Sequence, residues 1–169
     1  MAFVTSSGSV ISFAEYTDVL ELDQRLFEVN EGLSDDVVEP MLERATQRIL
    51  DRLRLTDWWR SYWLRRQTGT TVTSVADIPA LNIDRIKARQ QSFTDLCVYV
   101  GLAEYILPRV ADFGNEDSAE RKKMGYYSVQ ADKLLQELVS AGDFYDFDND
   151  GTVESTEKQP GQLQFKRIR

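Results

Sequence analysis

The chain has 169 residues, of which 42% are hydrophobic and 28% are charged, and its formal net charge at pH 7 is −8. These values are ordinary for a single globular domain that buries a real core. The chain contains no histidine and one cysteine, Cys97, which excludes an internal disulfide and nucleophilic catalysis of the Ser-His or Cys-His kind. We expect Cys97 to be buried in the core.

The charge is unevenly distributed along the chain. Residues 1–42 carry a net charge of −8, residues 43–109 of +4 and residues 110–169 of −4. Because nucleic-acid binding requires a basic surface, we expect no specific nucleic-acid partner. No stretch approaches the roughly 18 apolar residues of a membrane span, so we expect no membrane contact either. Opposed acidic and basic segments favour complementary contacts between protein subunits.

The first third of the chain predicts two helices. Residues 1–9 read as a flexible N-terminus, and Ser12–Glu15 has the spacing of a capping box that would begin a short helix ending near Asn30. Ser34 is the expected N-cap of the second helix. We expect Pro40 to lie in the first turn of that helix, where proline is tolerated. The apolar positions of the second helix recur at intervals of three and four: Val38, Met41, Leu42, Ala45, Ile49 and Leu53.

A basic stripe accompanies this apolar face. Arg44, Arg48 and Arg52 are four residues apart, so they lie on one side of the helix. The pattern fits a solvated helix face, and it also fits an interface with another subunit.

Residues 57–63 contain all three tryptophans of the chain. The pattern fits a core segment with a partly covered boundary. It also fits a protein-binding hot spot, because Trp, Tyr and Arg dominate such sites, and a membrane-surface insertion is the third alternative. The residues predicted to bind a partner here are Trp58, Trp59, Trp63, Arg65 and Arg66.

The middle of the chain predicts a long loop and two more helices. Residues 68–79 are rich in Thr and Ser and read as a loop. A third helix is expected to begin at Asn82 or Asp84 and to end near Pro108, and a fourth to run from Asp117 or Ser118 to about Gly142. The predicted fold class is therefore all-α, a bundle of about four helices with a long loop between helices 2 and 3 and a C-terminal extended arm. The predicted units are a helical bundle, residues 1–145, and a metal loop with the arm, residues 146–169.

The segment Asp146–Glu157 has the register of an EF-hand calcium loop. Acidic residues stand at positions 1, 3, 5, 9 and 12, and Gly151 stands at position 6, where the sharp turn needs a positive φ. Because hard cations take six to eight oxygen ligands, the sequence predicts a bound calcium ion. The predicted metal ligands are Asp146, Asp148, Asp150, Thr152, Glu154 and Glu157. The alternative is an acidic surface turn that holds no metal.

The flanks of this loop favour a structural role over a sensory one. A helix precedes the loop, whereas Pro160 and Gly161 would stop any helix that follows it within a turn. A sensor needs a second helix to move. We therefore expect a weak structural calcium clip, with a Kd on the order of 10⁻⁴–10⁻³ M.

The chain ends in a short basic segment in which apolar and polar residues alternate, as in a strand. A single strand is unstable alone, so this arm is expected to join the sheet edge of a neighbour. The residues predicted to bind a partner here are Leu163, Phe165, Lys166, Arg167, Ile168 and Arg169.

The layout resembles the head-to-tail adaptor (connector) proteins of tailed bacteriophages. The resemblance rests on the order of elements, on the run Leu42–Ile49 that leads into the Trp-rich segment, and on the tail Phe165–Arg169. It implies a structural virion protein of the neck, assembled in the host cytoplasm. It also implies a homo-oligomeric ring, typically of twelve copies, that binds the portal and tail or neck proteins and lets DNA pass. The arm would reach onto the portal.

Two other functions remain open from the sequence. The metal loop alone would suit a calcium-binding regulatory or interaction module. An enzyme working through carboxylates such as Glu39, Glu43 and Glu104 is the second alternative, but nothing in their spacing singles out a pair. We expect the protein not to be an enzyme.

Overall fold

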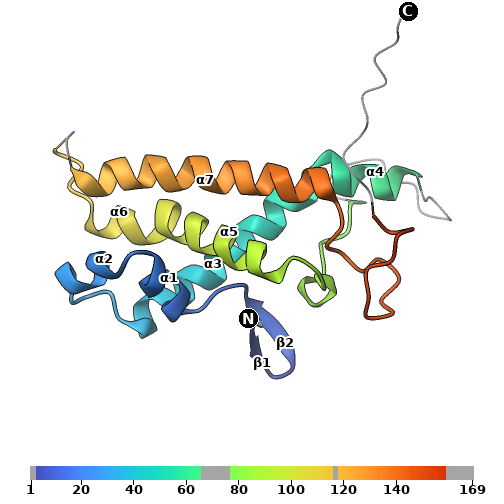
Figure 1. The fold of residues 1–169 in the computed structure, drawn as a ribbon, viewed down its shortest axis with the longest axis horizontal. Coiled ribbons are helices and arrows are strands. Elements are labelled where there is room, and N and C mark those ends of the chain that lie inside the picture. The colour runs from blue at the N-terminus through green and yellow to red at the C-terminus, as the bar shows by residue number, and fades with distance from the viewer. Residues whose placement is uncertain (1–2, 66–76, 116–117, 159–169) are drawn as a thin grey trace, which may run out of the picture.

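The computed structural model describes residues 3–65, 77–115 and 118–158. The chain is mostly helical, as predicted, but a small β-hairpin precedes the helices (Figure 1). The elements are β1 (Val4–Ser6), β2 (Ser9–Ser12), α1 (Tyr16–Leu22), α2 (Gln24–Val29), α3 (Asp35–Arg54), α4 (Asp57–Arg65), the 3₁₀ turn η2 (Ile83–Arg85), α5 (Gln90–Val100), the π-helical η3 (Gly101–Ile106), α6 (Leu107–Val110) and α7 (Ala119–Ala141).

The body of the protein is formed by α3, α5 with its continuation η3, and α7. In Figure 1, α7 runs along the long axis of the molecule, with α5 and α6 alongside it. Every apolar position predicted for α3 is buried, and Cys97 of α5 is 0% exposed, as expected from the sequence. The buried face of α7 consists of Tyr127, Ala131, Leu135 and Leu138. The 3.6-residue periodicity therefore identified the core correctly.

The N-terminal segment differs from its prediction. Residues 4–12 form an antiparallel hairpin where a flexible end was expected. Phe13 is 1% exposed, and its N–H donates to Thr46 Oγ1 at 3.1 Å, so the chain enters the core before any helix begins. The capping box forms at Glu15 with Asp18 and not at Ser12. Sequence spacing could not show that burying Phe13 would keep this stretch extended.

The first predicted helix is broken into α1 and α2 at Asp23. This residue is 8% exposed, and Lys123 Nζ lies 2.6 Å from its Oδ2. Burial of the Tyr127 hydroxyl and, to a lesser extent, the adjacent charge of Asp23 together raise its pKa to about 12. The break therefore coincides with an ion pair to α7, and such a pair between distant residues leaves no local signal in the sequence.

Helix α3 begins after Ser34 as predicted, but Pro40 lies inside the helix, beyond the first turn where we expected it. Two members of the basic stripe pair within the chain. Arg48 Nε lies 3.3 Å from Glu104 Oε2, and Arg52 forms an ion pair with Asp132 of α7. These pairs favour the interpretation of the stripe as part of the protein's own surface.

The third helix begins later than predicted. Asn82 caps only the short turn η2, and its side chain accepts a hydrogen bond from the Asp84 N–H at 2.9 Å. The long helix begins at Gln90, after Arg89 in the left-handed region with φ 57°. It then passes through η3 into α6, which contains Pro108.

Helix α7 has the predicted ends. Ser118 caps its N-terminus by accepting from the Arg121 N–H at 3.3 Å, and Gly142 ends it with φ 57°. Glycine is favoured there because it has no Cβ to clash in this region. The described helices include none that is both long and apolar enough to cross a membrane.

Candidate metal centre

The predicted metal loop follows α7 at one end of the molecule. Figure 1 shows residues 142–158 folding back beneath the C-terminal end of α7, next to α4. The entry to the loop is extended, because Tyr145 forms an isolated antiparallel bridge with Ile86. Four residues therefore separate the end of α7 from Asp146.

Three of the predicted ligands converge. Carboxylate oxygens of Asp146, Asp148 and Glu157 all lie within 4.8 Å of one another. Asp146 is 0% exposed and Glu157 is 3% exposed, whereas Asp148 is exposed. Two acids buried this deeply are unusual, because a buried charge must be paired or hydrogen-bonded.

Backbone N–H groups surround the two buried carboxylates. Asp146 accepts from Asn149 N at 2.5 Å and from Gly151 N at 2.8 Å. Glu157 Oε1 accepts from Phe147 N at 2.5 Å and from Asp148 N at 3.0 Å, and its Oε2 accepts from Glu154 N at 3.0 Å. Backbone N–H groups of the loop thus hold its first and last predicted ligands in place.

These contacts have opposite effects on two neighbouring acids. Burial by itself would raise the pKa of Asp146, yet the N–H groups of Gly151 and Asn149 hold that pKa below its usual value. Desolvation raises the pKa of Asp148, and the negative charges of Asp150 and Glu157 raise it further. Asp146, at position 1 of the loop, is therefore held in its charged form, and negative charge is concentrated around Asp148 at position 3.

The backbone turns that shape the loop occur at the expected positions. Gly151 has φ 98°, and a Cβ there would meet nothing within 4 Å. Glycine is therefore favoured at this position by the backbone conformation and not by a lack of space. Asn149 also has a positive φ, of 66°, a conformation that asparagine tolerates better than most residues.

The other predicted ligands do not join the cluster. Asp150 Oδ1 accepts from Thr152 N at 2.8 Å and from Thr152 Oγ1 at 3.0 Å, so this carboxylate is engaged within the turn. Glu154 is exposed. The structure therefore brings together positions 1, 3 and 12 of the loop and leaves positions 5, 7 and 9 at its surface.

The donor set fits a hard cation. All three converging groups are carboxylates, which are the ligands that calcium prefers. Glu157 Oε1 already accepts two N–H bonds, which use both of its lone pairs. Binding through both oxygens of Glu157 would therefore require one of these N–H groups to move.

Two of the three tryptophans predicted to bind a partner are inside the protein. Trp58 is 5% exposed and Trp59 1% exposed, and Trp59 Nε1 donates to the Pro79 carbonyl at 2.9 Å. Trp63 is half-buried. This placement favours the core interpretation of the Trp-rich segment for the first two rings. Arg66, the side chain of Arg65 and the whole arm Leu163–Arg169 lie outside the described residues.

Sequence reasoning missed the residues that hold the loop to the body. Phe147 is 8% exposed, and its ring centroid lies 3.8 Å from that of Tyr62 on α4. Arg85 Nη1 donates to the Phe147 carbonyl at 3.0 Å. The run Phe144-Tyr145-Asp146-Phe147 is the signal that could have found this contact, because large rings beside a ligand position need somewhere to pack.

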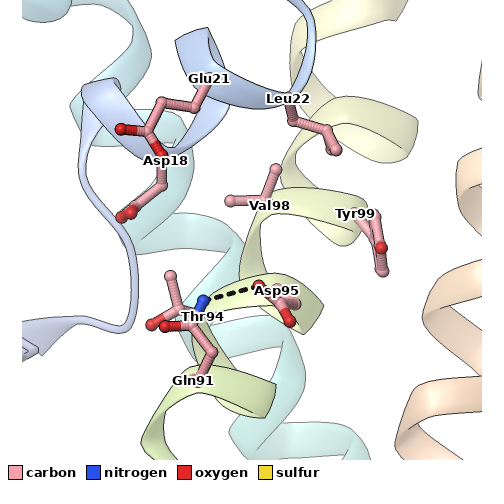
Figure 2. Close-up of a pocket in the computed structure, with 8 residues that line it drawn as sticks. All are labelled: Asp18, Glu21, Leu22, Gln91, Thr94, Asp95, Val98 and Tyr99. Atoms are coloured by element: carbon pink, nitrogen blue, oxygen red, sulfur yellow. Dashed lines mark hydrogen bonds between the residues drawn. The ribbon is translucent and has the colours of Figure 1, made fainter. Parts of the chain in front are cut away.

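A second acidic site is a cleft of about 210 Å³ between α1 and α5. Figure 2 shows Asp18 and Glu21 of α1 facing the α5 residues across it. Burial raises the pKa of Asp18, and so do the charges of Glu21 and Asp95. The Asp95 carboxylate accepts a hydrogen bond from Gln91 Nε2 at 2.9 Å. The cleft would repel anions, but its acids lack the register of a metal loop.

The acids considered for catalysis are dispersed. Glu39 and Glu43 are exposed on α3, and Glu104 pairs with Arg48.

Comparison with models of known protein families finds no match, and comparisons with curated proteins and with solved structures find none either.

Proposed function

We propose that the protein is a structural component of the neck of a tailed bacteriophage, a head-to-tail adaptor that forms a ring between portal and tail. The observation that carries the proposal is the anchoring of Glu157 by three backbone N–H groups at the end of the loop. The basic segment of residues 162–169 begins five residues later. An arm that leaves a rigid body at a fixed point suits a protein that must reach a neighbour in a defined direction.

The charge of the chain supports the same role. A ring through which DNA passes benefits from a negative lumen, because it repels the phosphate backbone, and the net charge here is −8. The basic arm, with Lys166, Arg167 and Arg169, would meet an acidic surface of the portal. Of the residues predicted to bind a partner in the Trp-rich segment and just after it, Trp63, Arg65 and Arg66 would remain to make these contacts, because Trp58 and Trp59 are buried.

We also propose that the loop binds one calcium ion. Asp146, Asp148 and Glu157 would hold it, and the exposed acids Asp150 and Glu154 and the Thr152 carbonyl would complete the oxygen shell. A bound divalent cation would offset the repulsion among these carboxylates. Its role in the adaptor is to fix the point at which the arm leaves the body.

Native mass spectrometry of the purified chain, with calcium chloride and with a chelator, tests both proposals. We expect a ring of about twelve copies, alone or on addition of the portal protein, and one calcium per copy. Deleting residues 163–169 is expected to abolish portal binding while helical circular dichroism is unchanged. Normal portal binding by the deleted chain would disprove the role of the arm.

A calcium-binding regulatory module is the second candidate, and the three converging acids favour it. It predicts a monomer at all concentrations and with all phage neck proteins. It also predicts a large change in shape on addition of calcium, which small-angle scattering would detect. A ring would contradict it.

A further inference from the structure

The metal loop and helix α4 share one layer of aromatic rings. Phe147 stacks on Tyr62 with an interplanar angle of 22°, and it lies 5.8 Å from Trp59 at 21°. Trp58 lies 4.6 Å from Phe144, just before the loop. The rings of α4 contact Phe144, Tyr145 and Phe147.

Hydrogen bonds join residues 145–147 to the segment that precedes α5. Asp146 N donates to the Arg85 carbonyl at 2.9 Å, and Arg85 Nη1 donates to the Phe147 carbonyl at 3.0 Å. Asn82 N donates to the Tyr145 hydroxyl at 3.2 Å. The beginning of the loop therefore lies between α4 on one side and residues 82–87 on the other.

Phe147 lies between two acids of the candidate metal centre. Phe147 joins Asp146 to Asp148 in the chain and its N–H donates to Glu157 Oε1 at 2.5 Å, while its ring stacks on Tyr62 of α4. Asp146, Asp148 and Glu157 lie within 4.8 Å of one another, so they repel without a cation and are drawn together with one. The two acids and the Phe147 ring therefore share one short stretch of backbone, and a shift of this backbone on binding would move the ring as well.

We propose that a calcium ion in the loop locks α4 onto the body through Phe147, and that the packing of α4 in turn sets the affinity of the loop for calcium. This inference rests on the calcium site proposed above. The ion regulates the order of α4 and of residues 77–88. We expect the effect of the ion to be confined to α4 and residues 77–88, which contact the loop directly, although Phe144 and Phe147 belong to the same hydrophobic core as the residues of α3, α5 and α7.

The coupling must be reciprocal, because two linked equilibria change each other by the same factor. Tyr62→Ala removes the ring that stacks on Phe147. We expect it to weaken calcium binding about 5- to 10-fold, at the low end of typical coupling between sites. Tyr62→Phe keeps the ring and is expected to bind calcium as the unchanged chain does. Tyr126→Ala, at a tyrosine that is 60% exposed on α7, is the matched control and should have no effect.

Hydrogen–deuterium exchange of the full chain, with calcium chloride or with a chelator, measures the other direction. We expect calcium to slow exchange about tenfold in residues 57–65 and 77–88 and to leave residues 127–141 unchanged. Isothermal titration calorimetry provides the calcium affinities of the three variants.

The outcomes separate the inference from the site on which it rests. No calcium binding by calorimetry would overturn both. Calcium binding with unchanged exchange in α4, or with an unchanged affinity in Tyr62→Ala, would overturn the coupling alone. Loss of calcium affinity in Tyr62→Phe as well as in Tyr62→Ala would also overturn it, because the stacked ring would then not be the link.

Discussion

The two ends of the molecule are stabilised in different ways. The body of α3, α5 and α7 has a mainly aliphatic core, in which Leu42, Leu96 and Leu102 are 0% exposed. The opposite end, formed by α4 and the metal loop, is built from stacked rings beside two buried acids, Asp146 and Glu157. The aliphatic core gains stability from area removed from water, whatever the ions in solution. The loop end depends on how its negative charges are compensated.

One small domain therefore combines a body whose stability does not depend on cations with a loop whose stability does. The buried acids of the loop are hydrogen-bonded to the backbone, so the loop can fold without a cation. Because repulsion among the carboxylates remains, a bound cation would stabilise the loop further. We therefore expect perturbations of the body to be insensitive to calcium and perturbations of the loop end to depend on it.

The largest effect is expected from the body. Leu42→Ala should lower the free energy of unfolding by about 3 kcal/mol, because it removes fully buried methyl groups and leaves a cavity. Urea denaturation should give the same loss with calcium and with a chelator. Leu55→Ala, at a leucine that is 52% exposed, is the control and should cost under about 1 kcal/mol. If the loss of unfolding free energy in Leu42→Ala changed with calcium, the stability of the body would not be independent of the loop end.

The stability of the body should also depend on pH. Burial raises the pKa of the Cys97 thiol to about 11, above its ordinary 9.0, although hydrogen bonds with Thr46 and Ser12 oppose the shift. The unfolded chain therefore loses the thiol proton first as the pH rises. The contribution is fully present below pH 9 and is lost as the pH rises to about 11. We expect a loss of about 2–3 kcal/mol from this group.

Urea denaturation between pH 8 and 11 measures this effect against Cys97→Ala, which has no thiol to titrate. The variant should lose correspondingly less stability over the window, with and without calcium. An equal loss in both proteins would show that the thiol is not sealed in the body.

The third effect should arise only at the loop end. Calcium at ten times its Kd should raise the free energy of unfolding by about 1.4 kcal/mol, because it binds the folded state alone. Glu157→Gln should abolish this gain, since Glu157 is the buried last ligand. Glu154→Gln, at an exposed position of the same loop, should keep most of it. Equal responses in the two variants would sink the assignment of the cluster as the site.

The smallest effect should come from the N-cap of α7. Ser118→Ala removes the oxygen that accepts from the Arg121 N–H and should cost about 1 kcal/mol. Ser128→Ala, at an exposed position within α7, is the matched control and should be neutral or slightly stabilising. Thermal unfolding monitored by circular dichroism at 222 nm compares the two variants.

Local patterns predicted much of the body and of the site. The apolar faces of α3, α5 and α7, the caps Ser34, Ser118 and Gly142, and the positive φ of Gly151 follow from neighbouring residues alone. The register of the loop predicted six ligands. In the fold, three of them converge: Asp146, Asp148 and Glu157. Asp150 turned to Thr152 because a turn offers nearby N–H groups that compete for its oxygen.

The apolar faces of the helices and the spacing of the acids in the loop can be recognised in the sequence, because both patterns are local. The remaining features depend on tertiary contacts. The tertiary structure buried Phe13 before the first helix, broke that helix at Asp23, which pairs with Lys123, and buried Trp58 and Trp59 against Phe144 and Phe147. Each of these depends on residues far apart in the chain, whose meeting is fixed only when the whole core closes.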